Sequence, residues 1–220
     1  MIIGVMGALE EEVRLIADSL VVSGTETHVK RTFYRGSLAG HEVVVVHSGI
    51  GKVRAAARSQ FLIEHFGVDR LIFAGVAGAL NPELAVGDIV VSDCALQWDF
   101  RSVRNEPQRY QADPALVALA VKMAERLDRK VYIGSVLTGD QPVIKLEHKQ
   151  ELWQTFNGYC VEMEGAAVAQ VCFMNEVPFV LIRAISDLAE GGSFEEFLRS
   201  FAKVAPLPAE IVLEMLKELS

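Results

Sequence analysis

Five short apolar runs constrain the fold of this chain more than any other feature. They are continuous rather than alternating, and they are rich in Val and Ile. Continuous runs of this length fit strands that are covered on both faces better than strands with one face in water. The runs occupy residues 2–7, 43–48, 71–76, 88–93 and 178–186. The chain is therefore expected to build a sheet that is flanked by helices.

Helical patterns separate these runs, over residues 9–20, 52–66, 114–127, 164–175 and 194–219. Gly67 is placed to end the second helix, and Pro114 suits the first turn of the third. Pro206 and Pro208 predict a break or kink in the last one. The alternation of apolar runs with helical patterns indicates an α/β fold rather than an all-β or all-α one.

Two adjacent runs, 32–40 and 41–49, meet at Ala39-Gly40 and predict an antiparallel hairpin. Together with the other runs, the hairpin predicts a mixed, twisted β-sheet flanked by helices. A length of 220 residues suits one sizeable core. We therefore expect a single domain over residues 1–220, with residues 97–112 as its main irregular loop.

Net charge and cysteine content narrow the functional classes. The formal net charge is −8 and the pI is about 5.2, so the surface would repel a phosphate backbone, and duplex nucleic acid is not an expected partner. Cys94, Cys160 and Cys172 form no C-x-x-C pair, and the histidines show no H-x-x-x-H spacing, so we expect no metal. The N-terminus does not resemble a signal peptide, and no run reaches the ~18 apolar residues of a membrane helix. We expect a cytoplasmic protein with no membrane contact.

Ligands of such sheets gather at the carboxyl ends of the strands. In this chain, glycine-rich and polar segments follow the apolar runs. They are Gly7-Ala8, Ser48 to Gly51, Gly75 to Gly78, Thr138 to Asp140, Glu162 to Glu164 and Ser186-Asp187. The glycine loop before residue 52 is neither a P-loop nor a dinucleotide-binding fingerprint, because a required glycine is absent in each case. We expect the site where these segments converge.

Acidic residues are the candidates for chemistry, and each has a structural alternative. A carboxylate at Asp187 would be half-shielded beside an apolar strand, but Ser186 and Asp187 are also good helix caps. Glu162 and Glu164 could share a strand face, or they could favour a first helical turn through the helix dipole. Of the three successive glutamates that end at Glu12, one can face the strand ends, and spacing alone does not say which.

Taken together, these fragments resemble one family over nearly the whole chain. They are G-x-x-G-A-x-E-E-E at 4–12, S-G-I-G-K at 48–52, G-x-A-G at 75–78, V-G-D-I-V-V-S-D at 86–93, G-D at 139–140, V-E-M-E at 161–164 and V-P-F-V-x-x-R-A-I-S-D at 177–187. Each fragment is weak by itself, but their order and spacing are specific. The chain resembles the methylthioadenosine/S-adenosylhomocysteine nucleosidases.

The resemblance implies a homodimeric α/β enzyme of the purine nucleoside phosphorylase-like superfamily. Such an enzyme acts on a small-molecule nucleoside, uses water as the nucleophile and needs no cofactor. Asp187 matches the family's general acid, which protonates N7 of adenine. Glu12 matches the base that activates the attacking water, and Glu164 matches the carboxylate that holds the ribose hydroxyls.

The resemblance also implies supporting roles for five residues. Met163 matches a residue that packs on the ribose and the base. Gly78 and Val143 match positions whose backbone contacts the ligand. Arg183 matches a residue that supports the glutamate site, and Ser186 matches a neighbour of the acid.

The acidic residues themselves argue against phosphorolysis. A phosphorylase must hold a dianion beside the anomeric carbon, usually with arginines. The segment after the first apolar run carries Glu10-Glu11-Glu12 instead. Water tolerates neighbouring carboxylates better than phosphate does, so turnover is expected to be independent of phosphate. A nucleoside sensor without activity is a further alternative, although a pure binder has no need for a water-activating carboxylate.

The chain departs from the family pattern around the base and the 5′ substituent. Pro142 stands where an aromatic residue usually covers the purine, and Val76 stands where serine is frequent. Residues 97–112 are shorter than usual, but they hold Trp98, Phe100 and Tyr110, which we expect at a dimer interface. These changes leave open futalosine or aminodeoxyfutalosine, substrates of menaquinone biosynthesis, as alternatives to methylthioadenosine.

Overall fold

The computed structural model describes residues 1–100, 107–187 and 200–219. Its sheet contains β1 (Ile2–Gly7), β2 (Val21–His28), β3 (Arg31–Leu38), β4 (His41–His47), β5 (Arg70–Ala79), β6 (Ile89–Gln97), β7 (Arg109–Gln111), β8 (Val131–Thr138), β9 (Gly158–Glu162) and β10 (Phe179–Asp187). The described helices are α1 (Glu10–Ser19), α2 (Lys52–Phe66), α3 (Pro114–Arg126), α4 (Leu146–Phe156), α5 (Gly165–Met174) and α7 (Pro206–Glu218).

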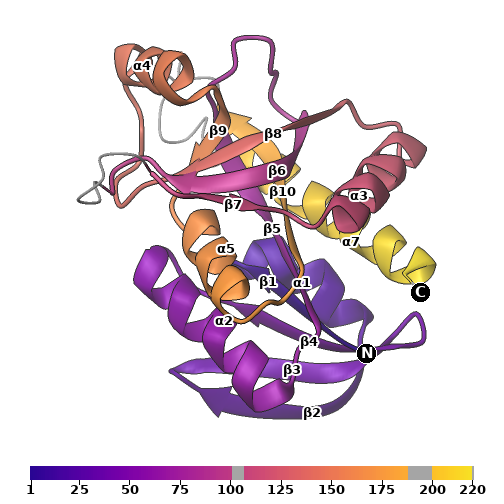
Figure 1. Cartoon of the computed structure of the whole chain (residues 1–220). Coiled ribbons are helices and arrows are strands. Elements are labelled where there is room, and N and C mark those ends of the chain that lie inside the picture. The colour runs from indigo at the N-terminus through magenta and orange to yellow at the C-terminus, as the bar shows by residue number, and fades with distance from the viewer. Residues whose placement is uncertain (101–106, 188–199, 220) are drawn as a thin grey trace.

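The strands form one mixed sheet in the order β10-β6-β8-β9-β5-β1-β4-β3-β2, with β7 beside β6 (Figure 1). β10 also pairs with β5, so β5, β9, β8, β6 and β10 close into a ring. Register irregularities in β6, β9 and β10 bend these strands, as closure requires. The mixed sheet flanked by helices is confirmed, whereas the ring was not predicted.

Helices cover both faces of the sheet. α2 and α5 pack against each other on one side, while α1, α3 and α7 lie together on the other (Figure 1). β1 and β10 are buried along almost their whole length, as their continuous apolar runs predict. α5 is apolar on nearly every face and is buried between α2 and the sheet.

Most predicted elements are present within a residue or two of their expected bounds. The hairpin joins β3 to β4 through Ala39 and Gly40, which have φ values of 52° and 85°. Both values are positive, as in the turns that match strand twist. Gly67 ends α2 in the left-handed conformation, with φ of 66°. Residues 200–204 are helical and α7 begins at Pro206, so the predicted break is confirmed, whereas residues 194–199 of the predicted helix lie outside the described part.

Five of the described elements were not predicted with bounds: β2, β7, α4, β8 and β9. The last two were implied only as apolar stretches before the polar segments at Thr138 and Glu162. β2 is exposed along most of its length at the sheet edge, so no apolar pattern indicates it. β7 lies inside residues 97–112, so the prediction of an irregular loop was wrong for Arg109–Gln111, and residues 101–106 lie outside the described part. α4 has only Lys149 and Leu152 on its buried face, too few apolar residues for a stripe.

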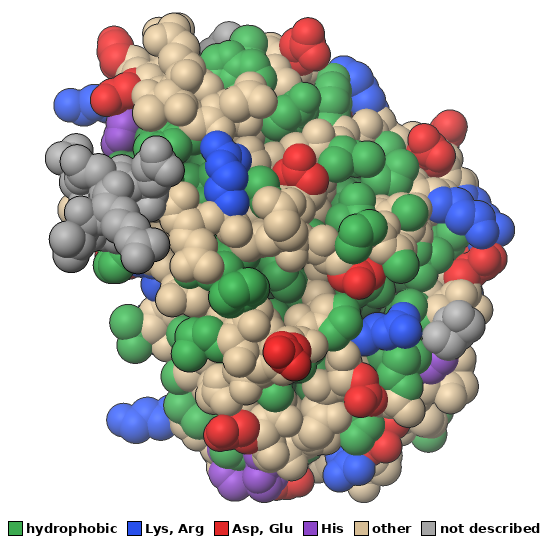
Figure 2. Space-filling model, viewed as in Figure 1, with side chains coloured by type: hydrophobic (Ala, Val, Ile, Leu, Met, Phe, Trp, Pro, Cys, Tyr) green, Lys and Arg blue, Asp and Glu red, His purple; other side chains and the backbone are tan. Residues whose placement is uncertain are grey.

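In the described residues, no helix is long and apolar enough to cross a membrane. On the face that Figure 2 shows, acidic and basic side chains are scattered among hydrophobic and uncharged ones.

Candidate active site

The candidate site lies where parallel strands end side by side. β1 and β10 both pair in parallel with β5, so their carboxyl ends meet at one edge of the sheet. This edge carries the segment after β1, residues 75–78 of β5 and Asp187 at the end of β10. The junction between β9 and α5 adds Glu162 and Glu164. The topology therefore brings together the polar segments that the sequence analysis singled out.

Glu12 is the one of the three successive glutamates that faces the strand ends. It is 2% exposed, whereas Glu10 and Glu11 are exposed to solvent. Its Oε2 accepts hydrogen bonds from the backbone N–H groups of Ala8 (2.7 Å) and Leu9 (2.8 Å), and its Oε1 accepts one from Val76 (2.9 Å). A carboxylate has about four acceptor positions, so one position stays available for a ligand.

Burial raises the pKa of Glu12 above its ordinary value, although these N–H donors and the charge of Arg183 oppose the rise. A glutamate with a raised pKa is a stronger base near neutral pH than an exposed one. β5 has Gly75 at this point, because an added Cβ would lie 2.8 Å from Glu12 Oε1 and 3.0 Å from Arg183 Nη1. The glycine therefore lets the carboxylate lie directly against the strand.

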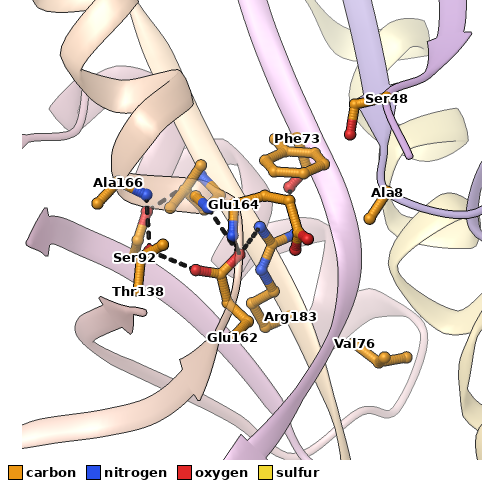
Figure 3. Close-up of polar contacts among 12 residues, drawn as sticks. Ala8, Ser48, Phe73, Val76, Ser92, Thr138, Glu162, Glu164, Ala166 and Arg183 are labelled. Carbon is orange, nitrogen blue, oxygen red and sulfur yellow. Dashed lines mark hydrogen bonds and ion pairs between the residues drawn. The ribbon is translucent and has the colours of Figure 1, made fainter. Parts of the chain in front are cut away.

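Glu162 has a structural role. The sequence patterns could not distinguish this role from that of Glu164. Its Oε2 accepts hydrogen bonds from Glu164 N (3.1 Å) and Gly165 N (2.7 Å), and so it holds the first turn of α5. The same oxygen forms an ion pair with Arg183 Nη2 at 2.9 Å, while Oε1 contacts the Thr138 hydroxyl (Figure 3). Glu162 is therefore fully engaged with the protein.

Glu164 occupies the N-cap position of α5, but its side chain does not cap the helix. Instead, Oε1 accepts a hydrogen bond from Gly51 N at the start of α2, at 2.6 Å. Burial and then the neighbouring charge of Glu162 raise its pKa to about 8, against the opposing influence of Gly51 N–H and Arg183. Of the two glutamates, Glu164 is thus the one with capacity left for a ligand.

Arg183 connects the buried carboxylates. It is 1% exposed, and its guanidinium lies 4.2 Å from the centroid of the Phe73 ring, with Nη1 donating to Phe73 O at 3.3 Å. Its charge lowers the pKa of both Glu12 and Glu164, which limits the effect of burial on each. Figure 3 shows Arg183 between Glu162 and Glu164.

Asp187 is the most accessible acid of the site. Its side chain is 37% exposed, and Ser186 Oγ lies 3.1 Å from its Oδ1. The Oδ2 atom accepts a hydrogen bond from Lys149 Nζ at 2.6 Å. Lys149 comes from α4 and was missed by the sequence analysis. The available signal was its position three residues before Leu152, which places a lysine on the buried face of a helix.

The residues expected to contact the purine base or the ribose differ in burial. Val143 is buried in a small apolar cluster that Trp98 joins from its edge. Trp98 also packs against Gly139, where an added Cβ would lie 2.4 Å from the indole nitrogen. Pro142 is exposed, and Met163 is partly exposed beside Glu164. Trp98 is therefore an aromatic residue that lies beside the segment of Gly139 to Val143, where the family's ring is missing.

Ion pairs beside the site join two further sequence motifs. Lys52, from the segment after the glycine loop, contacts Asp99 at 2.8 Å and Asp140 at 3.2 Å. Asp140 N also donates to Asp99 Oδ2 at 2.7 Å. These contacts join the start of α2 to the segments after β6 and β8, which explains why S-G-I-G-K and G-D occur together.

A group of side chains that could bind a metal lies elsewhere. Glu26, His28 and His65 offer ligand atoms within 4.8 Å of one another. Spacing did not reveal this group, because β2 and α2 bring its members together. The three residues are not among the acidic residues of the site, and Glu26 is an exposed residue of the edge strand.

Comparisons with known proteins show which family this chain belongs to. Residues 2–217 match the model of the phosphorylase superfamily. The chain is 40% identical, over 99% of both chains, to the 5′-methylthioadenosine/S-adenosylhomocysteine nucleosidase of Bacillus thuringiensis strain Al Hakam. A nucleosidase of the same name from Colwellia psychrerythraea, solved with adenine, is 36% identical with a TM-score of 0.92, covering 100% of this chain and 96% of its own.

A futalosine hydrolase of Helicobacter pylori is 30% identical with a TM-score of 0.92, and the match covers 100% of this chain and 98% of the other. The full-length matches carry the family assignment. The chain belongs to the phosphorylase superfamily and, within it, to the 5′-methylthioadenosine/S-adenosylhomocysteine nucleosidase family.

Proposed function

We propose that this protein hydrolyses the N-glycosidic bond of 5′-methylthioadenosine or S-adenosylhomocysteine and releases adenine and the 5-substituted ribose. The carrying observation is the placement of three acids around the end of β5. Glu12 binds Val76 N, while Asp187 is paired with Gly78 in the sheet. A strand rises about 3.3 Å per residue, so Glu12 and Asp187 contact β5 at points several ångströms apart. This separation suits a general acid at the purine and a general base at the water that attacks the ribose.

In the proposed mechanism, each acid acts at a different part of the nucleoside. Asp187 donates a proton to N7, so that adenine leaves as a neutral base while the ribose becomes oxocarbenium-like. Glu164 holds the ribose hydroxyls and stabilises the positive charge. Glu12 uses its remaining acceptor position to take a proton from the attacking water. The division of labour parallels that of the two carboxyl groups of glycosidases.

The remaining site residues support these acids. Gly78 lets the Asp187 carboxylate lie against β5, because a Cβ there would lie 3.1 Å from Asp187 Oδ2. The backbone of Gly78 is proposed to contact the ligand. Met163 and Val143 line the ribose and the base, Ser186 orients the Asp187 carboxyl group, and Arg183 holds Glu162 and limits the rise in the pKa of Glu12.

Water is favoured over phosphate by the way the backbone donors around Glu12, after β1 and in β5, are used. Converging backbone N–H groups are a common means of binding phosphate. Here the N–H groups of Ala8, Leu9 and Val76 donate to the Glu12 carboxylate. An internal anion therefore occupies the place where a phosphate would be held, and it would repel a second anion.

A panel of nucleosides tests the proposed function. The purified protein is incubated without phosphate with methylthioadenosine, S-adenosylhomocysteine, adenosine and futalosine, and free base is measured by chromatography. We expect adenine from the first two. Hypoxanthine from futalosine alone would favour the activity named for the Helicobacter pylori relative instead. No base from any nucleoside would refute catalysis and favour a sensor.

We also propose that the protein is a cytoplasmic homodimer. Of the three aromatic residues expected at the interface, Phe100 is exposed, whereas Tyr110 is buried in the core and Trp98 packs against a small apolar cluster. Ile50 and Val53 are also exposed, and the ion pair between Lys52 and Asp99 joins their segment to that of Phe100. Neighbouring exposed apolar residues are typical of an interface. The cysteines are buried and unpaired, which suits a reducing compartment. Light scattering at working concentration distinguishes the dimer from a monomer.

A further inference from the structure

Lys149 is a buried lysine in direct contact with the proposed general acid. Its side chain is 3% exposed, and Nζ lies 2.6 Å from Asp187 Oδ2. Both groups lie over Gly78, where an added Cβ would be 3.1 Å from Asp187 Oδ2 and 3.3 Å from Lys149 Nζ. Lys149 therefore lies at the end of the site where Asp187 would meet the base.

The ammonium group has more hydrogen-bonding capacity than this contact uses. A lysine ammonium carries three donors and no acceptor. Among the residues that the structure describes, Asp187 is the partner of Lys149 Nζ. Leaving buried donors without acceptors is costly. An acceptor on a ligand beside Asp187 would engage a further donor of Lys149.

The purine edge that faces Asp187 offers such an acceptor in one class of base. The edge that contains N7 also contains the substituent at position 6, which is an amino donor in adenine and an oxo acceptor in guanine. Hypoxanthine shares this oxo group. A carboxyl group alone can serve adenine, since one oxygen carries the proton to N7 and the other accepts from the amino group. An oxo group needs a donor, and Lys149 supplies one.

We infer that Lys149 is a specificity-determining residue that allows the site to cleave 5′-substituted 6-oxopurine nucleosides as well as adenine nucleosides. This inference rests on the proposed function and extends its substrate class. Asp187 acts on N7 in both cases. Lys149 Nζ donates to the 6-oxo oxygen of the first class, and the Asp187 carboxylate offers an acceptor to the 6-amino group of the second.

Two substrates that share a 5′ group and differ only at position 6 test the inference. They are 5′-methylthioadenosine and 5′-deoxy-5′-methylthioinosine, assayed with the wild type and with Lys149→Met. We expect the wild type to cleave both, with kcat/KM values within about tenfold of each other. In Lys149→Met, the ratio of kcat/KM for the oxo substrate to that for the amino substrate should fall about 100-fold, because losing a hydrogen-bond donor to a buried oxo group typically costs this much.

Control variants separate specificity from a general effect on folding. Lys145→Met removes an exposed lysine just before α4 and should leave the ratio unchanged. Lys149→Arg keeps a donor and should retain more oxo turnover than Lys149→Met, while thermal melting shows which variants are folded. If Lys149→Met lowers both kcat/KM values equally, or if the wild type cleaves only the amino substrate, the inference is wrong. A wild type that cleaves neither refutes the proposed function itself.

Discussion

Replacing Asp187 by Asn is expected to lower kcat for methylthioadenosine by about 1,000-fold, within the range typical of a lost general acid. The amide cannot transfer a proton to N7, so adenine would have to leave as an anion. In the wild type, Lys149 Nζ donates a hydrogen bond to Asp187 Oδ2 at 2.6 Å. Because the amide oxygen of Asn can accept the same bond, the local structure should persist.

Ligand binding distinguishes this loss from unfolding. Calorimetric titration with adenine should give a Kd for Asp187→Asn within about tenfold of the wild-type value, since the change removes proton transfer and not the whole base site. Asp18→Asn, at an exposed position of α1, serves as the matched control and should keep full turnover. Turnover by Asp187→Asn within a few-fold of the wild type would refute the assigned role of the acid.

Replacing Glu164 by Gln is expected to change how stability depends on pH. The pKa of Glu164 is raised to about 8 in the folded protein, from 4.5 for an unperturbed glutamate. The folded state therefore binds a proton that the unfolded state releases between these two values. This contribution to stability is complete below pH 4.5 and is lost as pH rises through 8. Glu164→Gln stays neutral and keeps no such dependence.

Thermal melting between pH 5 and 9 measures this difference. The Tm of Glu164→Gln minus that of the wild type should increase with pH, by several degrees at the alkaline end, because a shift of this size corresponds to a few kcal/mol. Glu11→Gln removes an exposed glutamate near the site and should show no such trend. A constant Tm difference across this range would show that Glu164 is ionised throughout.

Activity should respond in the opposite direction. The ionised carboxylate of Glu164 is the form that stabilises an oxocarbenium-like ribose, so kcat/KM of the wild type should rise with pH near 8. At alkaline pH, kcat/KM of Glu164→Gln should be about 100-fold below that of the wild type. The variant should also lack the increase of kcat/KM with pH. The variant is thus expected to be more stable and less active, which is common where a site stores a costly charge.

The amount of the site that the sequence could predict depends on how local each signal is. Continuous apolar runs identify the buried strands, and strand ends identify the site, because both follow from burial along the chain. The ring of strands depends on β10 pairing with both β5 and β6, which no local pattern contains.

The glutamates show the same limit at the level of single residues. Spacing could not choose among the three successive glutamates of α1, because the choice depends on which one the backbone N–H groups of Ala8, Leu9 and Val76 can reach. Nor could spacing assign different roles to Glu162 and Glu164, because Glu162 is engaged by Arg183, which lies 21 residues further along the chain. Lys149 is the extreme case, because its meaning appears only when α4 lies beside Asp187.

The central claim is that water, and not phosphate, cleaves the bond at a site organised by Glu12. The most direct measurement is turnover of methylthioadenosine by the wild type in water labelled with heavy oxygen, with and without excess phosphate. We predict free methylthioribose that carries the label, formed at a rate that does not depend on phosphate. Unlabelled sugar phosphate, formed at a rate proportional to phosphate concentration, would contradict the account.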